Sequence, residues 1–415
     1  MLRFLNGWLL LLSVCCPSLS AGDWPQILGE TRNGIASADE KLLDKWPKEG
    51  PQVLWEREVG HGYAGLAVKD RVAILFHRDE NEEAIEALDL KTGETLWKNG
   101  YATTFYPQVG GSIGDGPLCV PAIADGKVIT FGAQGVLTCT DLKSGDRLWQ
   151  VKTHDDFQAR EGYFGAGSSP IVIDGNVIVN VGGSRQKAGI VAFALADGEV
   201  VWQKTEEPAS YAAPASCTIS GIEHVLIVTR YKCSLLDAKS GALRFQFPFG
   251  QRGPTVNAAT PIVVDDHFLV TSSYGIGSVY AEFNLLNFET IWKEERALAS
   301  QYCTPIHRDG FIYVIDGRDD QPPADLKCLE LSSGKVQWTK PDFGYGTILA
   351  ADDKFLICKT NGELLLAELG PSGAKILSKA RPLRGTVRAL PALSEGCLLI
   401  RDQSTLKCLA VAPGL

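Results

Sequence analysis

The sequence lacks several features by which common protein classes are recognised. It has no sustained helical periodicity, no polybasic run and no low-complexity segment in its 415 residues. Its formal net charge is −9, and loss of a leader that contains Arg3 would make it −10, which disfavours nucleic acid or an acidic membrane surface as a partner. The six histidines are scattered, without the spacing of a metal motif. These absences argue against a helical fold, a nucleic-acid partner and a histidine metal site.

Cysteine is present, but not in a redox or zinc pattern. Eleven cysteines occur, of which Cys15 and Cys16 lie near the N-terminus, and none forms a C-x-x-C motif. Exported proteins commonly use disulfides. However, Cys139, Cys328 and Cys408 occupy equivalent positions of a repeat, which places them in different structural units and far apart. We therefore expect packing thiols, with disulfide bonds as the alternative.

The first twenty residues have the pattern of a signal peptide. Arg3 supplies a short positive region, residues 8–14 an apolar region, and residues 18–20 a small-residue cleavage site. The apolar run is shorter than the roughly 20 residues that span a bilayer. We expect an exported periplasmic or extracellular protein with no transmembrane segment, whose residues 21–415 form one domain. An N-terminal membrane anchor is the alternative.

What the sequence does contain is a repeat. Residues 87–97 run through an apolar pair, an acid, a leucine, a polar turn with glycine, a charge and an apolar residue to a closing tryptophan. From Trp97 to a worn last copy that ends at Leu377, successive closing positions are 52, 53, 43, 47, 46 and 39 residues apart. A period of roughly 40–50 residues with several short strands is typical of a β-propeller blade. The closing aromatic residues are Trp55, Trp97, Trp149, Trp202, Phe245, Trp292 and Trp338, and the turn glycines are Gly93, Gly145, Gly198, Gly241, Gly334 and Gly373.

Each repeat has a physical interpretation. Apolar and polar residues alternate as in a half-buried strand, and the glycine lies where a tight hairpin between the third and fourth strands needs a positive φ. The tryptophan after the turn can cover the apolar layer between neighbouring blades. Because one blade cannot bury both of its faces, the blades must stack around an axis.

The two ends of the chain predict how the ring closes. Trp55 resembles the closing aromatic of a blade whose other three strands are missing, and residues 389–393, 397–400 and 406–411 read as three strands without a fourth. Pairing the N-terminal strand with these three leaves no exposed edge. First-strand signals from Gly65 to Ala389 number eight. We therefore expect an all-β, eight-bladed propeller of four-stranded antiparallel blades, with seven blades as the alternative.

The Leu-Asp-x-x-Thr-Gly-x-x-x-Trp units resemble the repeats of pyrroloquinoline quinone (PQQ) β-propellers. The opening Asp23-Trp24-Pro25-Gln26 is similar to that of secreted bacterial members, many of them from planctomycetes. The resemblance covers nearly all of the chain after the leader. The family includes quinoprotein alcohol dehydrogenases, the outer-membrane assembly factor that scaffolds β-barrel insertion, and members without known activity. The resemblance therefore predicts the fold more specifically than the function.

For an enzyme of this family, the resemblance implies PQQ in the central funnel against a disulfide of adjacent cysteines, with calcium held by Glu, Asn and Asp. After residue 20 this chain has no adjacent cysteine pair and no C-x-x-C-H haem motif, and it is shorter than those enzymes. We therefore expect a non-catalytic exported propeller without a cofactor, acting as a binding or scaffold module for an envelope protein, a peptide or a glycan. The alternative is a PQQ- and calcium-dependent dehydrogenase of alcohols or sugars. We assign no catalytic or metal-binding residue, and we expect a monomer.

The alternation of strand direction predicts where a partner would bind. The turns between second and third strands and the connections between blades share one face of a propeller, and the longest predicted connections are 101–116 and 153–167. Aromatic and charged residues on such loops suit ligand or partner binding. The alternative is that these are variable, solvated loops that plug the funnel.

Residues just before each first strand should point toward the central channel. Three arginines in or near this ring could bind an anionic group such as PQQ or an acidic peptide. Alternatively, the arginines pair with Asp115 or Glu161 and merely fill the channel. The funnel candidates are Arg160, Tyr163, Tyr211, Arg252, Asn257, Gln301, Tyr302, Tyr345 and Arg388.

Overall fold

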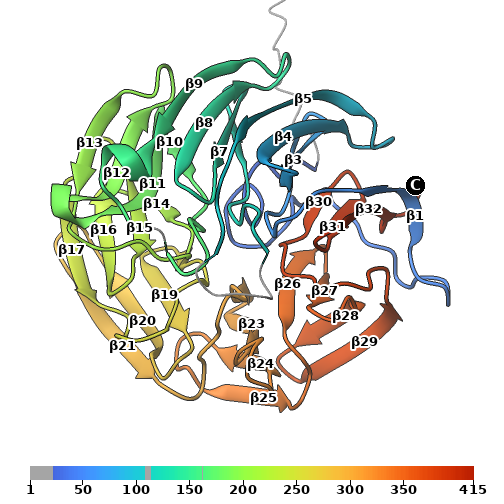
Figure 1. Ribbon diagram of the computed structural model, residues 1–415. Helices are drawn as coiled ribbons and strands as arrows, with labels where there is room; N and C mark the ends of the chain where they lie inside the picture. The colour runs from blue at the N-terminus through green and yellow to red at the C-terminus, as the bar shows by residue number, and fades with distance from the viewer. Residues whose placement is uncertain (1–21, 108–113, 161) are drawn as a thin grey trace, which may run out of the picture.

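The computed structural model describes residues 22–107, 114–160 and 162–415. Within these ranges, thirty-two strands form eight four-stranded antiparallel sheets arranged as a ring (Figure 1). The predicted signal peptide, residues 1–20, lies outside the described residues. The eight-bladed prediction is confirmed, and the seven-bladed alternative is wrong.

The strands of each blade follow one another in the chain. Blades one to four are β2–β5 (Ala67–Lys69, Val72–Asp79, Glu82–Asp89, Thr95–Ala102), β6–β9 (Ala122–Ala124, Lys127–Phe131, Val136–Asp141, Arg147–Lys152), β10–β13 (Ile171–Ile173, Asn176–Gly183, Ala188–Ala194, Val200–Lys204) and β14–β17 (Ala215–Ile219, Ile222–Val228, Lys232–Asp237, Leu243–Pro248). Blades five to eight are β18–β21 (Ile262–Val264, His267–Ser272, Gly277–Phe283, Phe288–Glu294), β22–β25 (Ile306–Arg308, Phe311–Asp316, Asp325–Glu330, Val336–Lys340), β26–β29 (Gly346–Ala351, Lys354–Lys359, Leu364–Gly370, Gly373–Ala380) and β30–β32 with β1 (Ala392–Ser394, Cys397–Arg401, Thr405–Ala410, Gln52–Glu58).

The last blade closes the ring as the sequence predicts. Strand β1 pairs antiparallel with β32, in a register that runs from Gln52 opposite Ala410 to Glu58 opposite Thr405. The N-terminal strand thereby supplies the fourth strand that the C-terminal segment lacks. This closure leaves no open edge on the third strand of the eighth blade.

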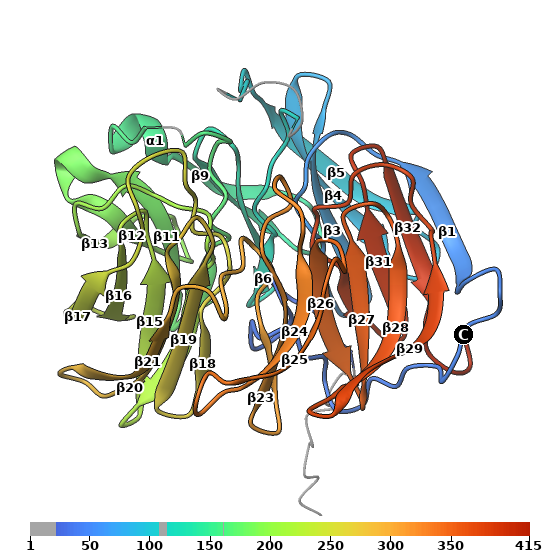
Figure 2. The same cartoon turned by 90° about the horizontal axis from the view of Figure 1, so that it is seen from below.

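Helical structure is minimal. In the described part of the chain the helices are α1 (Thr153–Asp156) and the 3₁₀ turn η1 (Ser184–Gln186). Residues 37–45 form turns and extended chain. None of the described helices has the length and hydropathy of a membrane span. Seen from the side, α1 lies at one face of the ring (Figure 2).

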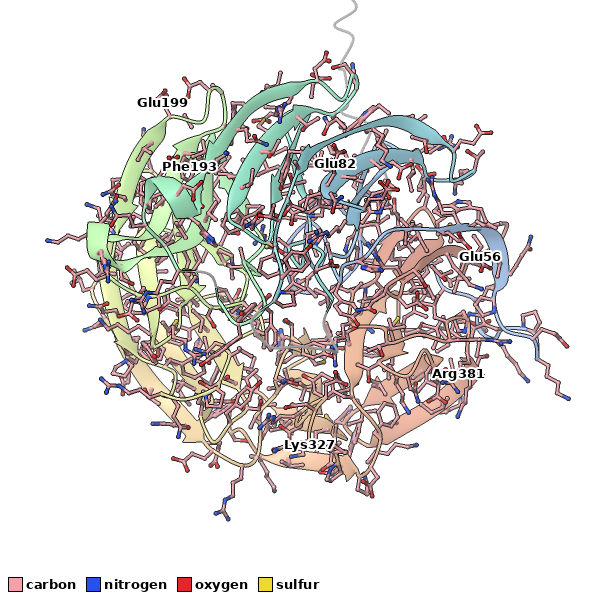
Figure 3. All side chains as sticks on the ribbon, in the orientation of Figure 1. Glu56, Glu82, Phe193, Glu199, Lys327 and Arg381 are labelled. Atoms are coloured by element: carbon pink, nitrogen blue, oxygen red, sulfur yellow. The ribbon has the colours of Figure 1, made fainter. Side chains whose placement is uncertain are left out.

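The apolar residues are buried within and between the sheets, and charge lies at the rim. Phe193 on β12 is fully buried, whereas Glu199, at the start of the outermost strand, is exposed at the edge of the ring (Figure 3). All nine cysteines of the described residues are free thiols, and only Cys217 is not fully buried. They contribute to packing, as expected, rather than to cross-links.

The repeated tryptophan and glycine act together across blade boundaries. Trp97 of the first blade donates its indole N–H to the carbonyl of Leu142 in the second blade, at 2.9 Å. Gly145 of the same turn has φ 77°, and a Cβ there would lie 2.7 Å from the Trp97 ring. The glycine is therefore required both by its backbone conformation and by the ring that covers it. The same pairing joins Trp55 to Gly93, Trp149 to Gly198, Trp202 to Gly241 and Trp292 to Gly334.

Two boundaries depart from this pattern. Phe245 has no N–H to donate, and the facing turn of the fifth blade, residues 284–287, has no glycine. Phe245 instead packs against a cluster of rings that includes Phe268 and Phe288. Trp338 bonds to the carbonyl of Gly370 at 2.8 Å, while Gly373, with φ 150°, has nothing within 4 Å of a built Cβ.

The segment before the first blade crosses the middle of the ring (Figure 1). Trp24, which is 2% exposed, forms a bridge with Val68 of the first blade, and the N–H of Ile123 in the second blade bonds to the carbonyl of Pro25 at 2.7 Å. Further on, the carbonyl of Gly34 accepts from Ala350 of the seventh blade at 2.8 Å. Residues 22–36, which we call the N-terminal plug, therefore connect the first, second and seventh blades.

Candidate functional site

Loops are distributed unequally between the two faces of the ring. The turns between third and fourth strands have two to five residues, whereas the connection from β5 to β6 has 19 and that from β9 to β10 has 18. The long connections lie on the face that also carries α1 (Figure 2). We call this the loop face.

A polar pocket opens on the loop face where the third and fourth blades meet. Its volume is about 470 Å³, within the range of roughly 300–1,000 Å³ that is usual for ligand sites. It is lined by the connection after β9, the turns after β11 and β15, and the connections after β13 and β17. Three of these segments carry an arginine at the pocket. We call this site the arginine pocket.

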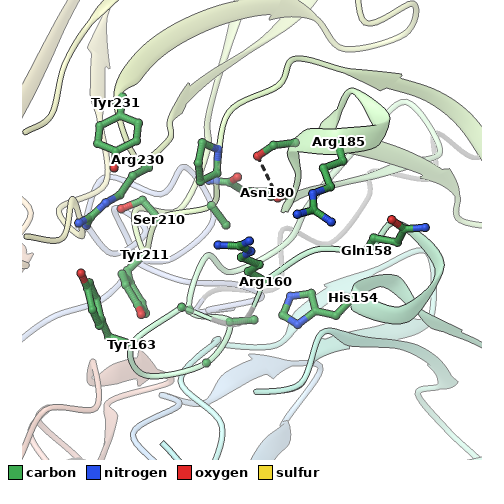
Figure 4. A pocket seen from close by; sticks show the side chains of 18 of the residues that line it. His154, Gln158, Arg160, Tyr163, Asn180, Arg185, Ser210, Tyr211, Arg230 and Tyr231 are labelled. Atoms are coloured by element: carbon green, nitrogen blue, oxygen red, sulfur yellow. Dashed lines mark hydrogen bonds between the residues drawn. The ribbon is translucent and has the colours of Figure 1, made fainter. Parts of the chain in front are cut away.

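The three arginines are Arg160, Arg185 and Arg230 (Figure 4). None of them forms an ion pair with another described residue. Figure 4 shows Arg160 and Arg185 extending from different segments into the same space. Arg230 donates to the carbonyl of Gly253 at 2.5 Å, and its guanidinium lies 5.6 Å from the ring centre of Tyr163. The pocket therefore concentrates positive charge without a compensating acid in the described part of the chain.

Aromatic residues form one wall of the arginine pocket. The hydroxyl of Tyr211 accepts a hydrogen bond from the backbone N–H of Phe164 at 3.0 Å. Burial raises the pKa of Tyr211 to about 12, so that the phenol stays neutral at physiological pH. Tyr163 donates to the carbonyl of Gly253 at 3.4 Å, and its ring lies 6.3 Å from that of Phe164.

The buried side of the pocket contains polar atoms without partners. Asn180, within β11, is 1% exposed, and neither its amide nitrogen nor its amide oxygen has a hydrogen-bond partner among the described residues. The Nδ1 atom of His154 is also buried and without a partner there. Burial lowers the pKa of His154 to about 4, which makes this imidazole neutral at pH 7. Buried amide groups are nearly always hydrogen-bonded, so that Asn180 has capacity for a ligand.

A second polar cluster, which we call the central cluster, surrounds Arg388. Arg388 forms an ion pair with Asp319 at 2.8 Å and lies 5.5 Å from the ring centre of Tyr63. The hydroxyl of Tyr345 accepts from the backbone N–H groups of Tyr302 and Cys303, at 2.7 and 3.0 Å. Burial raises the pKa of both Tyr302 and Tyr345 well above the usual value. The charges of Arg388 and Asp319 and the hydroxyl of Tyr345 are satisfied within this cluster, whereas the buried hydroxyl of Tyr302 has no hydrogen-bond partner among the described residues.

The structure divides the predicted funnel residues between these two places. Arg160, Tyr163 and Tyr211 line the arginine pocket. The central cluster contains Tyr302, Tyr345, Arg388 and Gln301, whose side chain accepts from the Asp319 N–H at 2.9 Å. Asn257 and Arg252 belong to neither, because Asn257 donates to three backbone carbonyls of the fourth blade and its following loop, and Arg252 is exposed without a polar contact to a described residue.

The expected ring of three arginines therefore does not form. Arg160 lines the arginine pocket, whereas Arg388 is engaged by Asp319 and Arg252 is part of neither site. The alternative pairing with Asp115 is also wrong for these arginines, since Asp115 lies 3.5 Å from Arg78 and 3.0 Å from His61. Glu161 lies outside the described residues.

Sequence reasoning missed Arg185, Arg230 and Asn180. Arg185 and Arg230 lie at turns between second and third strands, which the alternation of strand direction assigns to the loop face, and Asn180 lies within β11. The predicted site residues came from the long connections and from the positions before first strands. A count of basic residues in these short turns would have found Arg185 and Arg230, but Asn180 lies within a strand and carries no signal of its own.

The described residues contain no group of three or more His, Cys, Asp or Glu side chains that could hold a metal ion. Near the central cluster, the carboxylate of Asp319 is already bonded to Arg388, and that of Asp320 to Arg318. The donor set that calcium prefers, several free oxygen ligands around one point, is not assembled there.

Comparison with known proteins shows which family the sequence matches. The sequence matches the family described as outer membrane protein assembly factor BamB over residues 81–340. It is 22% identical to the outer membrane protein assembly factor BamB of Burkholderia pseudomallei (strain K96243) over 269 residues, which cover 55% of this chain and 67% of that protein.

Solved structures share the fold. BamB from Moraxella catarrhalis is similar with a TM-score of 0.64 at 16% identity, over 88% of this chain and 98% of that one. The quinohemoprotein alcohol dehydrogenase from Comamonas testosteroni is similar with a TM-score of 0.70 at 14% identity, over 95% of this chain and 81% of that one. At these identities the likeness concerns architecture, because both an outer membrane protein assembly factor and an alcohol dehydrogenase have it.

Proposed function

Because the chain belongs to the family of outer membrane protein assembly factor BamB, we propose that it is a non-catalytic exported propeller that binds a protein of the cell envelope. The binding surface is the loop face. In this proposal the blades provide a rigid ring, and the partner contacts the long connections between them.

The difference between the two faces carries this proposal. On the loop face, the 19-residue connection after β5 presents Tyr106, which is 70% exposed and lies 5.3 Å from the guanidinium of the buried Arg78. Exposed aromatic residues held by the scaffold are frequent contacts in protein interfaces. On the opposite face the turns are short, and most are covered by the tryptophan of the preceding blade.

The alternative function, a PQQ- and calcium-dependent dehydrogenase, has less support from the residues present. The adjacent cysteine pair of the alcohol dehydrogenases has no counterpart after residue 20. Arg388, the arginine of the central cluster, is bonded to Asp319, and the N-terminal plug lies across the ring. The residues described in the centre therefore do not fit the cofactor and its calcium.

Site-specific photo-crosslinking tests the proposed function. The photoreactive residue p-benzoylphenylalanine replaces Tyr106 on the loop face or, as a matched control, Leu286, which is 83% exposed on a turn of the opposite face. We expect irradiation in the native envelope to link one discrete envelope protein to position 106 and none to position 286. Equal adducts at both positions would contradict binding through the loop face. Calcium-dependent PQQ binding with dye reduction by an alcohol or sugar would replace the proposal with the alternative function.

A further inference from the structure

The charge of the arginine pocket is not balanced by any acid of the described residues. Arg160, Arg185 and Arg230 line one cavity of about 470 Å³, and no carboxylate of the described residues pairs with any of them. Three half-buried arginines elsewhere are paired, Arg388 with Asp319, Arg244 with Asp237 and Arg57 with Glu86. In the pocket, Arg230 is half-buried, whereas Arg160 and Arg185 are exposed.

No described acid near the pocket bonds to its arginines. Glu207 precedes the lining residue Pro208, but its carboxylate bonds to Lys232 at 3.0 Å. Asp155 and Asp156 on α1 are exposed and have no bond to a pocket arginine. Like charges gathered in one concave site raise the local concentration of anions. The pocket therefore attracts a negatively charged group from outside the chain.

Asn180 gives the second, independent indication of a ligand. Its side chain lines the pocket, is 1% exposed, and has an unpartnered N–H donor and an unpartnered oxygen acceptor. A carboxylate alone satisfies only the donor. A peptide group offers both a carbonyl oxygen and an N–H, which matches both halves of the Asn180 amide. The pocket is thus complementary to an anion that is attached to a polypeptide backbone.

We infer that the arginine pocket binds an acidic segment of the partner protein, with a carboxylate between Arg160 and Arg185 and a peptide group on the amide of Asn180. Arg230, held over Tyr163 and bonded to the carbonyl of Gly253, forms the rim beside the aromatic wall. This inference deepens the proposed function and rests on it for the partner being a protein. Guanidinium groups suit this role because they bond carboxylates in pairs and remain charged at all physiological pH values.

Calorimetric titration of the full-length exported protein with a defined peptide tests the inference. The probe is acetyl-Gly-Glu-Tyr-Glu-Gly-amide, and the control peptide has Gln in place of both Glu. We expect a Kd below about 1 mM for the Glu peptide and about tenfold weaker binding of the Gln peptide. Raising the salt concentration weakens only the Glu peptide, because the pocket arginines are partly exposed.

Three variants locate the binding. Arg160→Gln and Arg185→Gln each remove one carboxylate partner, and Asn180→Leu removes both amide contacts at similar volume. We expect each to weaken the Glu peptide about five- to tenfold. Arg384→Gln is the matched control, because Arg384 is an exposed arginine of the loop face that does not line the pocket. It should leave the Kd unchanged. The melting temperature of each variant verifies folding, and we expect Asn180→Leu to melt no lower than the unmodified protein.

Three outcomes would overturn the inference. If the Gln peptide binds as tightly as the Glu peptide, or if Arg384→Gln weakens binding as much as Arg185→Gln, the pocket does not bind an acidic segment. If inorganic phosphate or free glutamate binds as tightly as the Glu peptide, the pocket takes a free anion and the peptide assignment is wrong. None of these results affects crosslinking at position 106, so that the proposed function and this inference can fail separately.

Discussion

The centre of the ring and the arginine pocket both contain arginines, yet they satisfy them in opposite ways. In the centre, Arg388 is paired with Asp319, and each guanidinium nitrogen of Arg32 in the N-terminal plug donates a hydrogen bond to a carbonyl or amide oxygen of its own chain. In the arginine pocket, Arg160 and Arg185 have no such partners among the described residues, and Asn180 has none for either amide atom. Polar groups that are satisfied internally stabilise the fold, whereas groups left unsatisfied are available to a ligand.

This difference also explains why the more obvious site is the weaker candidate. The centre of a propeller is where a cofactor is expected from the family resemblance, and it holds conspicuous tyrosines. In this chain the plug and the central cluster use that space for structure. The pocket between the third and fourth blades lies off the centre and keeps its charge available.

The largest expected change in stability follows a substitution in the centre of the ring. Arg32→Ala removes a buried guanidinium that donates to Gln26 at 2.7 Å, to the carbonyl of Pro214 at 2.9 Å and to that of Pro170. Burial lowers the pKa of Arg32 to about 9, so that it remains charged at pH 7. We expect the free energy of unfolding to fall by about 4 kcal/mol, since bonds from a charged donor contribute about 1.5–3 kcal/mol each and part of this is regained from its desolvation. Urea denaturation measures the change, and a loss below about 1 kcal/mol would show that the plug is not structural.

One substitution made at two asparagines sharpens the comparison. Asn257 donates to the carbonyls of Thr229, Arg230 and Phe249, whereas Asn180 has no partner. We expect Asn257→Leu to lower the free energy of unfolding by about 3 kcal/mol and Asn180→Leu to raise it by about 1 kcal/mol. Denaturant titration of both variants tests this. The same sign at both positions would contradict the distinction between satisfied and unsatisfied groups.

A smaller loss is expected at the central ion pair. Asp319→Ala leaves Arg388, whose side chain is 22% exposed, without its carboxylate partner. We expect a loss of about 2 kcal/mol in stability, because a largely buried charge loses its pair, and no change in the affinity for the acidic peptide. Stronger peptide binding by Asp319→Ala would contradict the distinction between the centre and the arginine pocket, since Arg388 would then be the anion site.

The smallest effect concerns pH. The pKa of His154 is about 4 in the folded protein, against about 6.5 when unfolded. The unfolded chain therefore takes up a proton first as the pH falls, so that the stabilisation present above pH 6.5 is lost progressively toward pH 4. We expect His154→Gln to reduce the loss of stability between pH 7 and pH 5 by about 1–2 kcal/mol. His77, with a similarly lowered pKa, is present in both proteins and cancels in the difference. Equal pH profiles would place His154 in contact with solvent.

The architecture could be predicted from the sequence because each repeat determines its own strands and turns. The turn needs a glycine with a positive φ, and the tryptophan must pack on an apolar surface. The N-terminal strand and the three C-terminal strands must pair to complete a blade. Each of these requirements can be recognised from residue order alone, as the pairing of β1 with β32 shows. The second role of Gly145, to leave room for Trp97 of the preceding blade, is a contact between repeats and could not be predicted from either repeat alone.

The site was predicted only in part. The choice of the loop face and of Arg160, Tyr163 and Tyr211 followed from strand direction and connection length. Which acid each arginine would meet did not follow, because Asp319 and Arg388 are separated by 69 residues and come from different blades. An unsatisfied amide such as that of Asn180 is a property of three-dimensional surroundings, and no sequence pattern reports it.

A crystal structure of the protein with the Glu peptide bound is the measurement that tests this account most directly. The account predicts a peptide carboxylate between Arg160 and Arg185, a peptide group bonded to both atoms of the Asn180 amide, and an unchanged pair between Arg388 and Asp319. A peptide bound in the centre of the ring at Arg388, with the arginine pocket empty, would contradict it.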